Sequence, residues 1–336
     1  MDITIRDISK LAGVSTATVS RVLADSEKVK PDTRNKVLKI IKEYGYEPNQ
    51  IARNLTSSRT NTIGLVVETT SNPFFMEIAQ AVEEKLTEAG YLMLTMNTNW
   101  EMSREEASIR ALRRNRVDGV ILTPISLESE SVRLLEKWSL PFVLLNIDAQ
   151  REDISSIGTN DYQGGILAGQ SLLKSGATSI VCLQGFPHQS TFNRLKGLSH
   201  TVRSSAEGKC RDIKIIENIR TYEEGYKIGE KLINYHLPPD GPLGVFATND
   251  DVALGVLASL YDHGVGVPFQ VSVVGYDDIP MSDRFKIPLT TIAQPTQELG
   301  KLAARSIMDQ ISGVNSSPRS YQLIPKIVQR ASTVSF

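Results

Sequence analysis

A regular alternation of strand-like and helix-like segments begins at Ile63 and continues almost to the end of the chain, and it restricts the possible folds more than any other feature. Short apolar runs rich in β-branched residues are typical of buried strands, and amphipathic segments between them are typical of helices. Strands are predicted at 63–68, 91–97, 119–123, 142–147, 179–184, 213–219, 244–248, 271–276 and 290–293; helices at 76–89, 104–115, 163–174, 194–203, 223–235, 252–262 and 296–311. This order predicts an α/β protein with parallel, doubly wound sheets.

There are too many of these elements for one compact sheet, so we expect two similar lobes with a cleft between them. Ligands of parallel sheets bind beyond the carboxyl ends of the strands. The residues at those positions are the candidates for a ligand site: Asn72, Phe74, Phe75, Asn97, Thr123, Asp148, Asn160, Asp161, Arg194, Arg220, Asn249, Asp277 and Gln294.

The first two dozen residues have a different pattern, which is typical of a helix-turn-helix. Residues 4–12 carry Ile5, Ile8 and Leu11 at helical spacing, Gly13 and Val14 interrupt them, and a second helix is predicted over 15–23. The residues left facing outward at the start of this second helix are short, with one arginine following: Ser15, Thr16, Ala17, Thr18 and Arg21. Such a surface fits a DNA major groove, where hydroxyl, methyl and guanidinium groups reach base edges and phosphates.

A third helix is predicted over 30–44, with Val37, Ile40, Ile41 and Tyr44 as the apolar stripe that closes a three-helix core. The segment 45–55 shows only Ile51, Ala52 and Leu55 on one side. This is too little apolar surface to hold two helical turns in water, so we expect a helix that forms conditionally. Residues 56–62 are a polar linker.

Charge is distributed unevenly along the 336 residues. Residues 1–60 contain 11 Lys or Arg against 7 Asp or Glu, a net +4, and the remainder contains 26 against 31, a net −5. The basic end is therefore where a polyanion would dock. Cys182 and Cys210 have no metal-ligand spacing and are expected to be reduced thiols. Without an export signal or a long apolar run, we expect a cytoplasmic protein that contacts no membrane.

The motifs together closely resemble the LacI/GalR family of bacterial transcriptional repressors. The resemblance rests on residues 5–23, 45–49 and 52–55, and continues through 72–75, 117–119, 194–197, 249–250, 274–278 and 289–295. It implies a DNA-binding domain over 1–58, with the helix-turn-helix at 4–23 and a hinge helix at 48–56. It also implies an effector-binding and dimerisation domain over 59–336, with an N-lobe of about 62–160 plus 292–320 and a C-lobe of about 161–291 plus 321–336.

The same resemblance implies a homodimer that docks on palindromic double-stranded operator DNA. The implied DNA-contacting residues are Thr4, Ser15, Thr16, Ala17, Thr18, Arg21, Asn49, Ala52, Arg53 and Leu55. Leu55 corresponds to the hinge leucine that enters the minor groove at the operator centre. We expect repression that a small effector relieves, through an allosteric shift of the lobes that unwinds the hinge.

For the effector, the resemblance implies a sugar held by Arg194, Asn249, Asp277 and Gln294. The pair Asn160-Asp161 is inverted relative to the usual order in the family. Family members often carry an aromatic residue five positions before a Gly-Tyr glycine, where this chain has Arg220. A second arginine favours a sugar acid or sugar phosphate, whereas an offset loop with Tyr222 in the aromatic position leaves a neutral sugar or a purine open.

Other functions are disfavoured or remain as alternatives. The sequence has no nucleophile elbow, no phosphate-binding loop and no zinc protease motif, and the glycine pair Gly264 and Gly266 precedes a proline, so we expect no enzyme, metal or cofactor. An exported solute-binding protein would need a signal segment and no DNA reader. Two regulatory alternatives stay open: a global carbon-catabolite regulator controlled by a phosphorylated sugar-transport protein, and a purine-type repressor that needs its corepressor.

Overall fold

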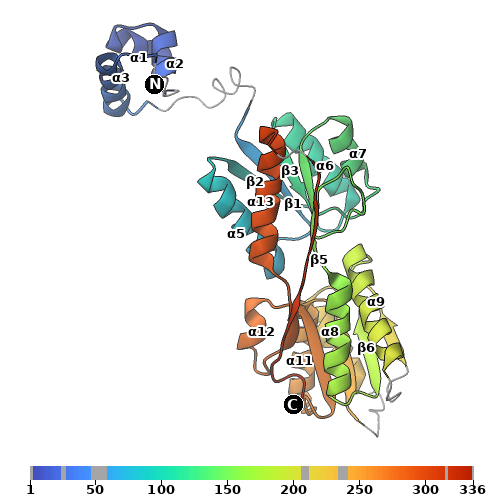
Figure 1. Cartoon of the computed structure of the whole chain (residues 1–336). Helices are drawn as coiled ribbons and strands as arrows, with labels where there is room; N and C mark the ends of the chain where they lie inside the picture. The colour runs from blue at the N-terminus through green and yellow to red at the C-terminus, as the bar shows by residue number, and fades with distance from the viewer. Residues whose placement is uncertain are drawn as a thin grey trace. The chain divides into compact units, whose positions relative to one another are not determined.

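The computed structural model describes residues 3–23, 28–46, 59–205, 212–233, 241–314 and 317–334 (Figure 1). Contacts divide the chain into two units, Met1–Thr60 and Asn61–Phe336. The α/β fold with a small helical N-terminal domain, predicted from the sequence, is confirmed by this architecture.

The described part of the first unit contains three short helices: α1 (Ile5–Ala12), α2 (Thr16–Leu23) and α3 (Pro31–Glu43). Thr4 caps α1, since its hydroxyl accepts the Asp7 amide proton and the Asp7 carboxylate accepts the Thr4 amide proton in return. Gly13, with φ of 67°, ends α1 in the left-handed conformation that permits the tight turn into α2.

The core of this helical unit differs from the predicted stripe at two positions. Leu11 and Tyr44 are exposed, whereas Ala12 and Tyr46 are buried with Ile8 and Val37. Ala12 lies one turn after Ile8 and therefore takes the inward position that the sequence suggested for Leu11. Tyr46 reaches the core because its amide donates to the Ile41 carbonyl and folds the chain back after α3.

The N-lobe of the second unit is built on a six-stranded parallel sheet. Its strands are β1 (Thr62–Val67), β2 (Leu92–Asn97), β3 (Gly119–Leu122), β4 (Phe142–Leu145), β5 (Ser156–Thr159) and β11 (Ser320–Leu323), in the order β11-β5-β4-β3-β1-β2. Helices α5 (Pro73–Glu88) and α13 (Thr296–Ser312) pack together, as do α6 (Met102–Arg114) and α7 (Glu130–Lys137) (Figure 1). Neighbouring β1 residues join different cores, Leu65 with α5 and Val66 with α6, so the two helix pairs cover opposite faces.

The C-lobe repeats this plan. Its strands are β6 (Ser179–Leu183), β7 (Ile213–Ile216), β8 (Leu243–Ala247), β9 (Val271–Asp277), β10 (Thr290–Ala293) and β12 (Lys326–Val328), in the order β12-β10-β9-β8-β6-β7. Only β12 runs antiparallel to its neighbour among these strands. The helices of the lobe are α8 (Asp161–Lys174), α9 (Gln189–Ser204), α10 (Tyr222–Ile233), α11 (Asp250–Asp262) and α12 (Pro280–Arg284).

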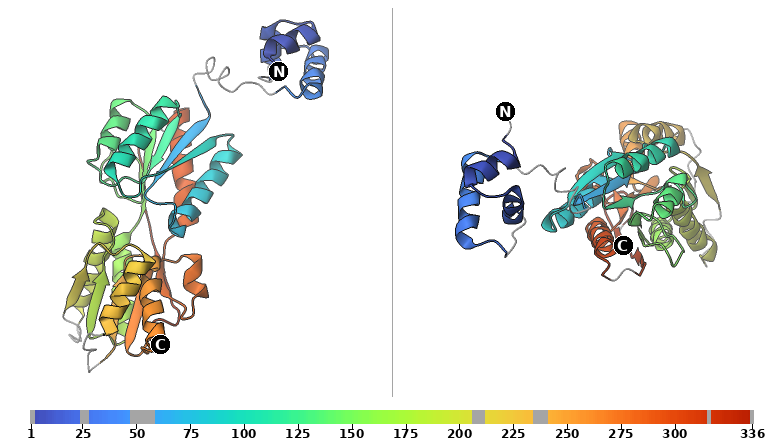
Figure 2. Two further views of the ribbon diagram at one scale, coloured as in Figure 1. Left: turned by 180° about the vertical axis from the view of Figure 1, so that it is seen from behind. Right: turned by 90° about the horizontal axis from the view of Figure 1, so that it is seen from above.

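The chain crosses between the lobes three times: from β5 into α8, from β10 into α13, and from β11 into β12 (Figures 1 and 2). The last two crossings lie at about residues 294 and 324. Residues 292–293 therefore belong to the C-lobe sheet and 321–323 to the N-lobe sheet, a few residues away from the bounds expected from the sequence.

The sequence prediction missed β5, β11, β12, α7 and α12. The first of these reads Ser-Ile-Gly-Thr and β11 reads Ser-Tyr-Gln-Leu, so neither has an apolar run. Their strand conformation comes from pairing with neighbours in the sheet, which a local pattern does not show. Helices α7 and α12 have 8 and 5 residues, too few for a clear periodic pattern.

Candidate functional site

The outward face of α2 offers the surface predicted for DNA. Ser15, Thr16, Ala17 and Arg21 are exposed, and Thr18 is half-buried. The amide and the hydroxyl of Thr18 both bond the Ser15 hydroxyl. Thr4 is also exposed. The apolar side chains Val19 and Val22 turn inward, so the helix leaves a small, polar surface that a groove can accommodate.

The expected hinge contacts fall on residues that the structure does not cover. Asn49, Ala52, Arg53 and Leu55 all lie outside the described ranges. Their roles therefore stay predictions.

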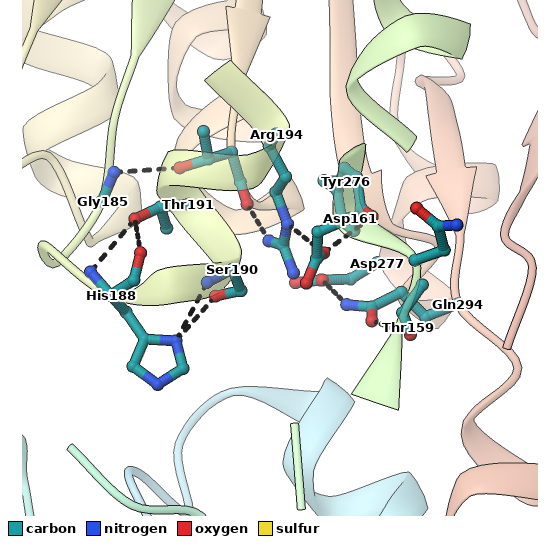
Figure 3. A network of polar contacts seen from close by, with 12 residues as sticks. Thr159, Asp161, Gly185, His188, Ser190, Thr191, Arg194, Tyr276, Asp277 and Gln294 are labelled. Atoms are coloured by element: carbon teal, nitrogen blue, oxygen red, sulfur yellow. Dashed lines mark hydrogen bonds and ion pairs between the residues drawn. The ribbon is translucent and has the colours of Figure 1, made fainter. Parts of the chain in front are cut away.

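Arg194 on α9 is the centre of a buried polar group in the C-lobe (Figure 3). Its Nε donates to Asp161 Oδ1 at 2.7 Å, and Nη1 donates to the Thr248 carbonyl at 2.6 Å. The guanidinium carbon lies 3.6 Å from the ring centroid of Tyr276, whose hydroxyl donates to the same Asp161 oxygen. Asp161, which stands in an inverted pair by comparison with the family, is thus the counter-ion of the arginine.

Asp277 and Gln294 lie beside this group, at the ends of β9 and β10 (Figure 3). Gln294 Nε2 donates to Asp277 Oδ1 at 2.7 Å, and Gln294 Oε1 accepts a hydrogen bond from Thr159 Oγ1 at 2.6 Å. Gln294 therefore connects the end of β5 with the crossing segment that follows β10. Burial raises the pKa of Asp277 well above its usual range, and the charge of Arg194 opposes that shift.

Several contacts join the two lobes around the same place. His188 Nε2 lies 3.1 Å from the Pro124 carbonyl of the N-lobe, and its Nδ1 accepts the Ser190 amide proton at the start of α9. This arrangement makes Nε2 the protonated nitrogen, and burial lowers the pKa of His188. The Gln189 amide bonds both backbone groups of Asp148, at 2.8 and 3.0 Å. The lobes are thereby held together by neutral hydrogen bonds.

An aromatic contact also spans the lobes. Trp100, which follows β2, and Phe186, which follows β6, have ring centroids 5.0 Å apart. Arg220 lies outside the buried Arg194 group: it is exposed, and its guanidinium carbon is 5.2 Å from the Phe186 ring centroid. Tyr222, the other candidate for that position, is 39% exposed at the start of α10.

The remaining predicted effector residues make structural contacts of their own. Three asparagines cap helices: Asn72 caps α5, Asn160 caps α8 and Asn249 caps α11, each through its side-chain oxygen. Phe74 and Phe75 are buried in the hydrophobic core, and the Thr123 hydroxyl donates to the Val66 carbonyl. Asn97 is exposed. The structure therefore assembles Asp161, Arg194, Asp277 and Gln294 into one group, and a contact to an effector stays a prediction for the others.

Sequence reasoning missed Glu68, His188, Gln189, Thr159 and Tyr276. Tyr276 was only the last residue of the predicted strand 271–276, and His188 had no partner at any recognisable spacing. Glu68 could have been found, because an acidic residue directly follows the buried run 63–67, at the position where ligands of parallel sheets lie.

Cys182 is buried, and burial raises the pKa of its thiol to about 12, so it is an unreactive thiol. Cys210 lies outside the described residues. Within the described ranges, no helix combines the length and apolar character needed to cross a membrane.

A small helix-turn-helix unit joined to two α/β lobes with a buried polar group at their strand ends defines the class of ligand-binding transcriptional regulators. Two family models match the chain accordingly. Residues 4–49 match the bacterial regulatory proteins of the lacI family, and residues 170–333 match a periplasmic binding protein-like domain.

A curated relative from Photobacterium profundum, the HTH-type transcriptional repressor PurR, is 33% identical to this chain over 331 residues. The match covers 98% of each of the two chains. The chain belongs to the LacI family, and it is a DNA-binding transcriptional repressor; the family comprises regulators and not enzymes.

Two solved structures support the same fold. The lac repressor dimer bound to operator and the anti-inducer ONPF matches with a TM-score of 0.87 and 24% identity, covering 100% of each chain. The complex of the transcriptional regulator CelR with cellobiose matches with a TM-score of 0.72 and 29% identity, covering 98% of this chain and 99% of that one.

Proposed function

We propose that the protein is a homodimeric repressor of a carbohydrate catabolic operon, released from a palindromic operator by a small effector bound between the lobes. The observation that carries this proposal is the buried group of Arg194, Asp161, Asp277 and Gln294 at the strand ends beside the lobe junction. Guanidinium, carboxylate and amide groups in one dry site suit the paired hydroxyls of a sugar. The relative CelR was solved with cellobiose.

The charge of the site argues against an anionic effector. Arg194 is paired with Asp161, and the nearby acids Asp277 and Glu68 are buried as well. Arg220, on which the expectation of a sugar acid rested, is exposed and lies over Phe186. We therefore favour a neutral or cationic effector over a uronate or a sugar phosphate.

A purine-type effector is the second candidate, and the relatives favour it. Several PurR repressors are 31–34% identical to this chain across nearly its full length. The Trp100 and Phe186 rings, which face each other across the lobe junction, offer a planar contact surface for a heterocycle.

The test is a footprint of the purified full chain on the DNA upstream of its own gene, with neutral sugars, amino sugars, sugar acids and purine bases added in turn. We expect a protected palindrome whose protection a neutral sugar or an amino sugar relieves. If only purines change the protection, and they strengthen it, the effector is a purine corepressor and not a sugar. Failure to protect this DNA at low ionic strength would refute the repressor proposal as it concerns this region.

Arg21→Ala should weaken operator binding by about 1–3 kcal/mol, because an exposed guanidinium on α2 can fork onto a guanine edge. Binding to unrelated DNA should fall much less. Lys39→Ala, at an exposed position of α3, is the matched control and should change specific and unrelated binding alike. Gel-shift titrations on both DNAs measure the ratio, and an unchanged ratio in Arg21→Ala would contradict base contact.

Leu55→Ala should weaken operator binding about tenfold or more, since an apolar wedge in the minor groove is lost. Thermal unfolding of the two lobes should not change. Leu55→Met retains an apolar wedge and should bind almost normally. An operator affinity of Leu55→Ala equal to that of the parent chain would exclude the hinge role.

A further inference from the structure

Glu68 is a buried acid without a partner. It follows β1 directly, its exposed fraction is 0%, and neither of its carboxylate oxygens has a hydrogen-bond partner among the described residues. A carboxylate taken out of water without donors costs several kcal/mol. A ligand that supplies donors at this point would offset that cost.

Other unsatisfied polar atoms lie at the same ends of the two sheets. Thr98 Oγ1 follows β2 and Gln184 Nε2 follows β6, and both are buried without a partner among the described residues. Glu105 Oε1 on α6 is also unpartnered, while its other oxygen accepts the Ile125 amide proton at 2.7 Å. Buried polar atoms without hydrogen-bond partners among the described residues therefore lie at the carboxyl edges of both sheets, where ligands of this fold bind.

Acidic side chains outnumber basic ones around Glu68. Burial raises the pKa of Glu68 well above its usual range; Arg194 opposes that shift, and Glu105 and Asp277 add to it. The single arginine of this group already forms an ion pair with Asp161 at 2.7 Å. Three buried acids thus face one arginine whose charge is engaged elsewhere.

We propose that Glu68 contacts the effector and selects a ligand that carries a protonated nitrogen, such as the ammonium group of an amino sugar. This inference deepens the proposed function and rests on it. An ammonium group supplies the missing donors, and its positive charge offsets the cost of ionising Glu68 in a buried position. A hydroxyl group or a bound water would supply donors only, and an anionic group would supply no donor and would further disfavour ionisation of Glu68.

The test is a thermal-shift titration of the full chain at pH 6.5, where the amino sugars carry a protonated nitrogen, with matched ligand pairs. The pairs are D-glucosamine with D-glucose, D-galactosamine with D-galactose, and methylammonium chloride with sodium chloride; D-glucuronate is the anionic probe. We expect stabilisation by the amines that exceeds that of their neutral partners. Glu68→Gln should lower amine affinity about tenfold, and Glu83→Gln, at an exposed position of α5, should leave it unchanged.

The empty protein provides a second readout. A folded-state pKa above the unfolded value means that stability is present at low pH and is lost as the pH rises through the folded pKa. Glu68→Gln should therefore raise the thermal midpoint more at pH 8.5 than at pH 5.5, and Glu83→Gln should not. If Glu68→Gln does not fold, Glu68→Ser is used in its place. The charged groups that face Glu68 in this titration are Arg194, Glu105 and Asp277.

Three outcomes overturn the inference: equal binding of amino and neutral partners, amine binding that survives Glu68→Gln, or no stabilisation by any amine of the panel. The proposed function is judged separately, because a neutral sugar that releases the operator would support it in each of these cases. Failure of every compound to affect operator binding would count against the proposed function itself.

Discussion

Arg194→Met is expected to lower the free energy of unfolding by about 3–5 kcal/mol and to abolish the response of operator binding to effector. Removing one partner of a buried ion pair leaves the other charge uncompensated, here Asp161. The substitution also removes the donor to the Thr248 carbonyl and the cation above the Tyr276 ring. Urea denaturation and an effector titration of the gel shift measure the two effects.

A second variant separates stability from ligand response. Arg194→Met with Asp161→Asn removes both charges and keeps an acceptor for the Tyr276 hydroxyl, so it should recover part of the lost stability. It should not recover the effector response. Arg203→Met, at an exposed position of the same helix, is the control and should behave like the parent chain. Wild-type stability in Arg194→Met would show that the ion pair contributes little.

Gly165→Ala is the second substitution with a large expected effect, a loss of about 3 kcal/mol. Helix propensity alone predicts the opposite, a gain of roughly 1 kcal/mol, because alanine favours helices over glycine. A Cβ atom at Gly165, however, would lie 2.0 Å from the Arg194 carbonyl oxygen of α9, and one at Gly197 would lie 2.0 Å from the Tyr162 carbonyl oxygen of α8. The two helices pack backbone to backbone, so the added methyl forces them apart.

The measurement is thermal and urea unfolding of Gly165→Ala beside Gln170→Ala, which sits at an exposed position of α8. The control should gain a few tenths of a kcal/mol from propensity alone. Because α9 carries Arg194, a weakened effector response should accompany the loss of stability. If Gly165→Ala is more stable than the parent chain, α8 and α9 can move apart at little cost in free energy.

The main architecture could be predicted because buried parallel strands appear in the sequence as short apolar runs. The elements that escaped prediction, such as β11 and β12, are short strands held in place by their neighbours. The same contrast holds for the candidate site. Asp277 and Gln294 could be placed together because the ends of parallel strands meet at one edge of a sheet, and the resemblance to the family placed Arg194 with them.

The residues that escaped prediction depend on tertiary contacts. His188 belongs to the site because it bonds the Pro124 carbonyl, 64 positions earlier. Thr159 belongs to it because it donates to Gln294, 135 positions later. Arg220 shows the reverse case: its sequence position suggested a place in the cleft, and its exposed side chain over Phe186 does not join the Arg194 group. Long-range pairs of this kind leave no local periodicity.

The three chain crossings limit how the protein can be divided. A fragment that stops near residue 160 would lack β11 and α13, and so would leave the N-lobe sheet without an edge strand and one of its covering helices. Neither lobe corresponds to a contiguous stretch of gene, and exchange of the C-lobe between relatives requires three junctions. The helical unit, by contrast, is joined by one connection after Thr60, so grafting a different DNA reader onto these lobes needs only one.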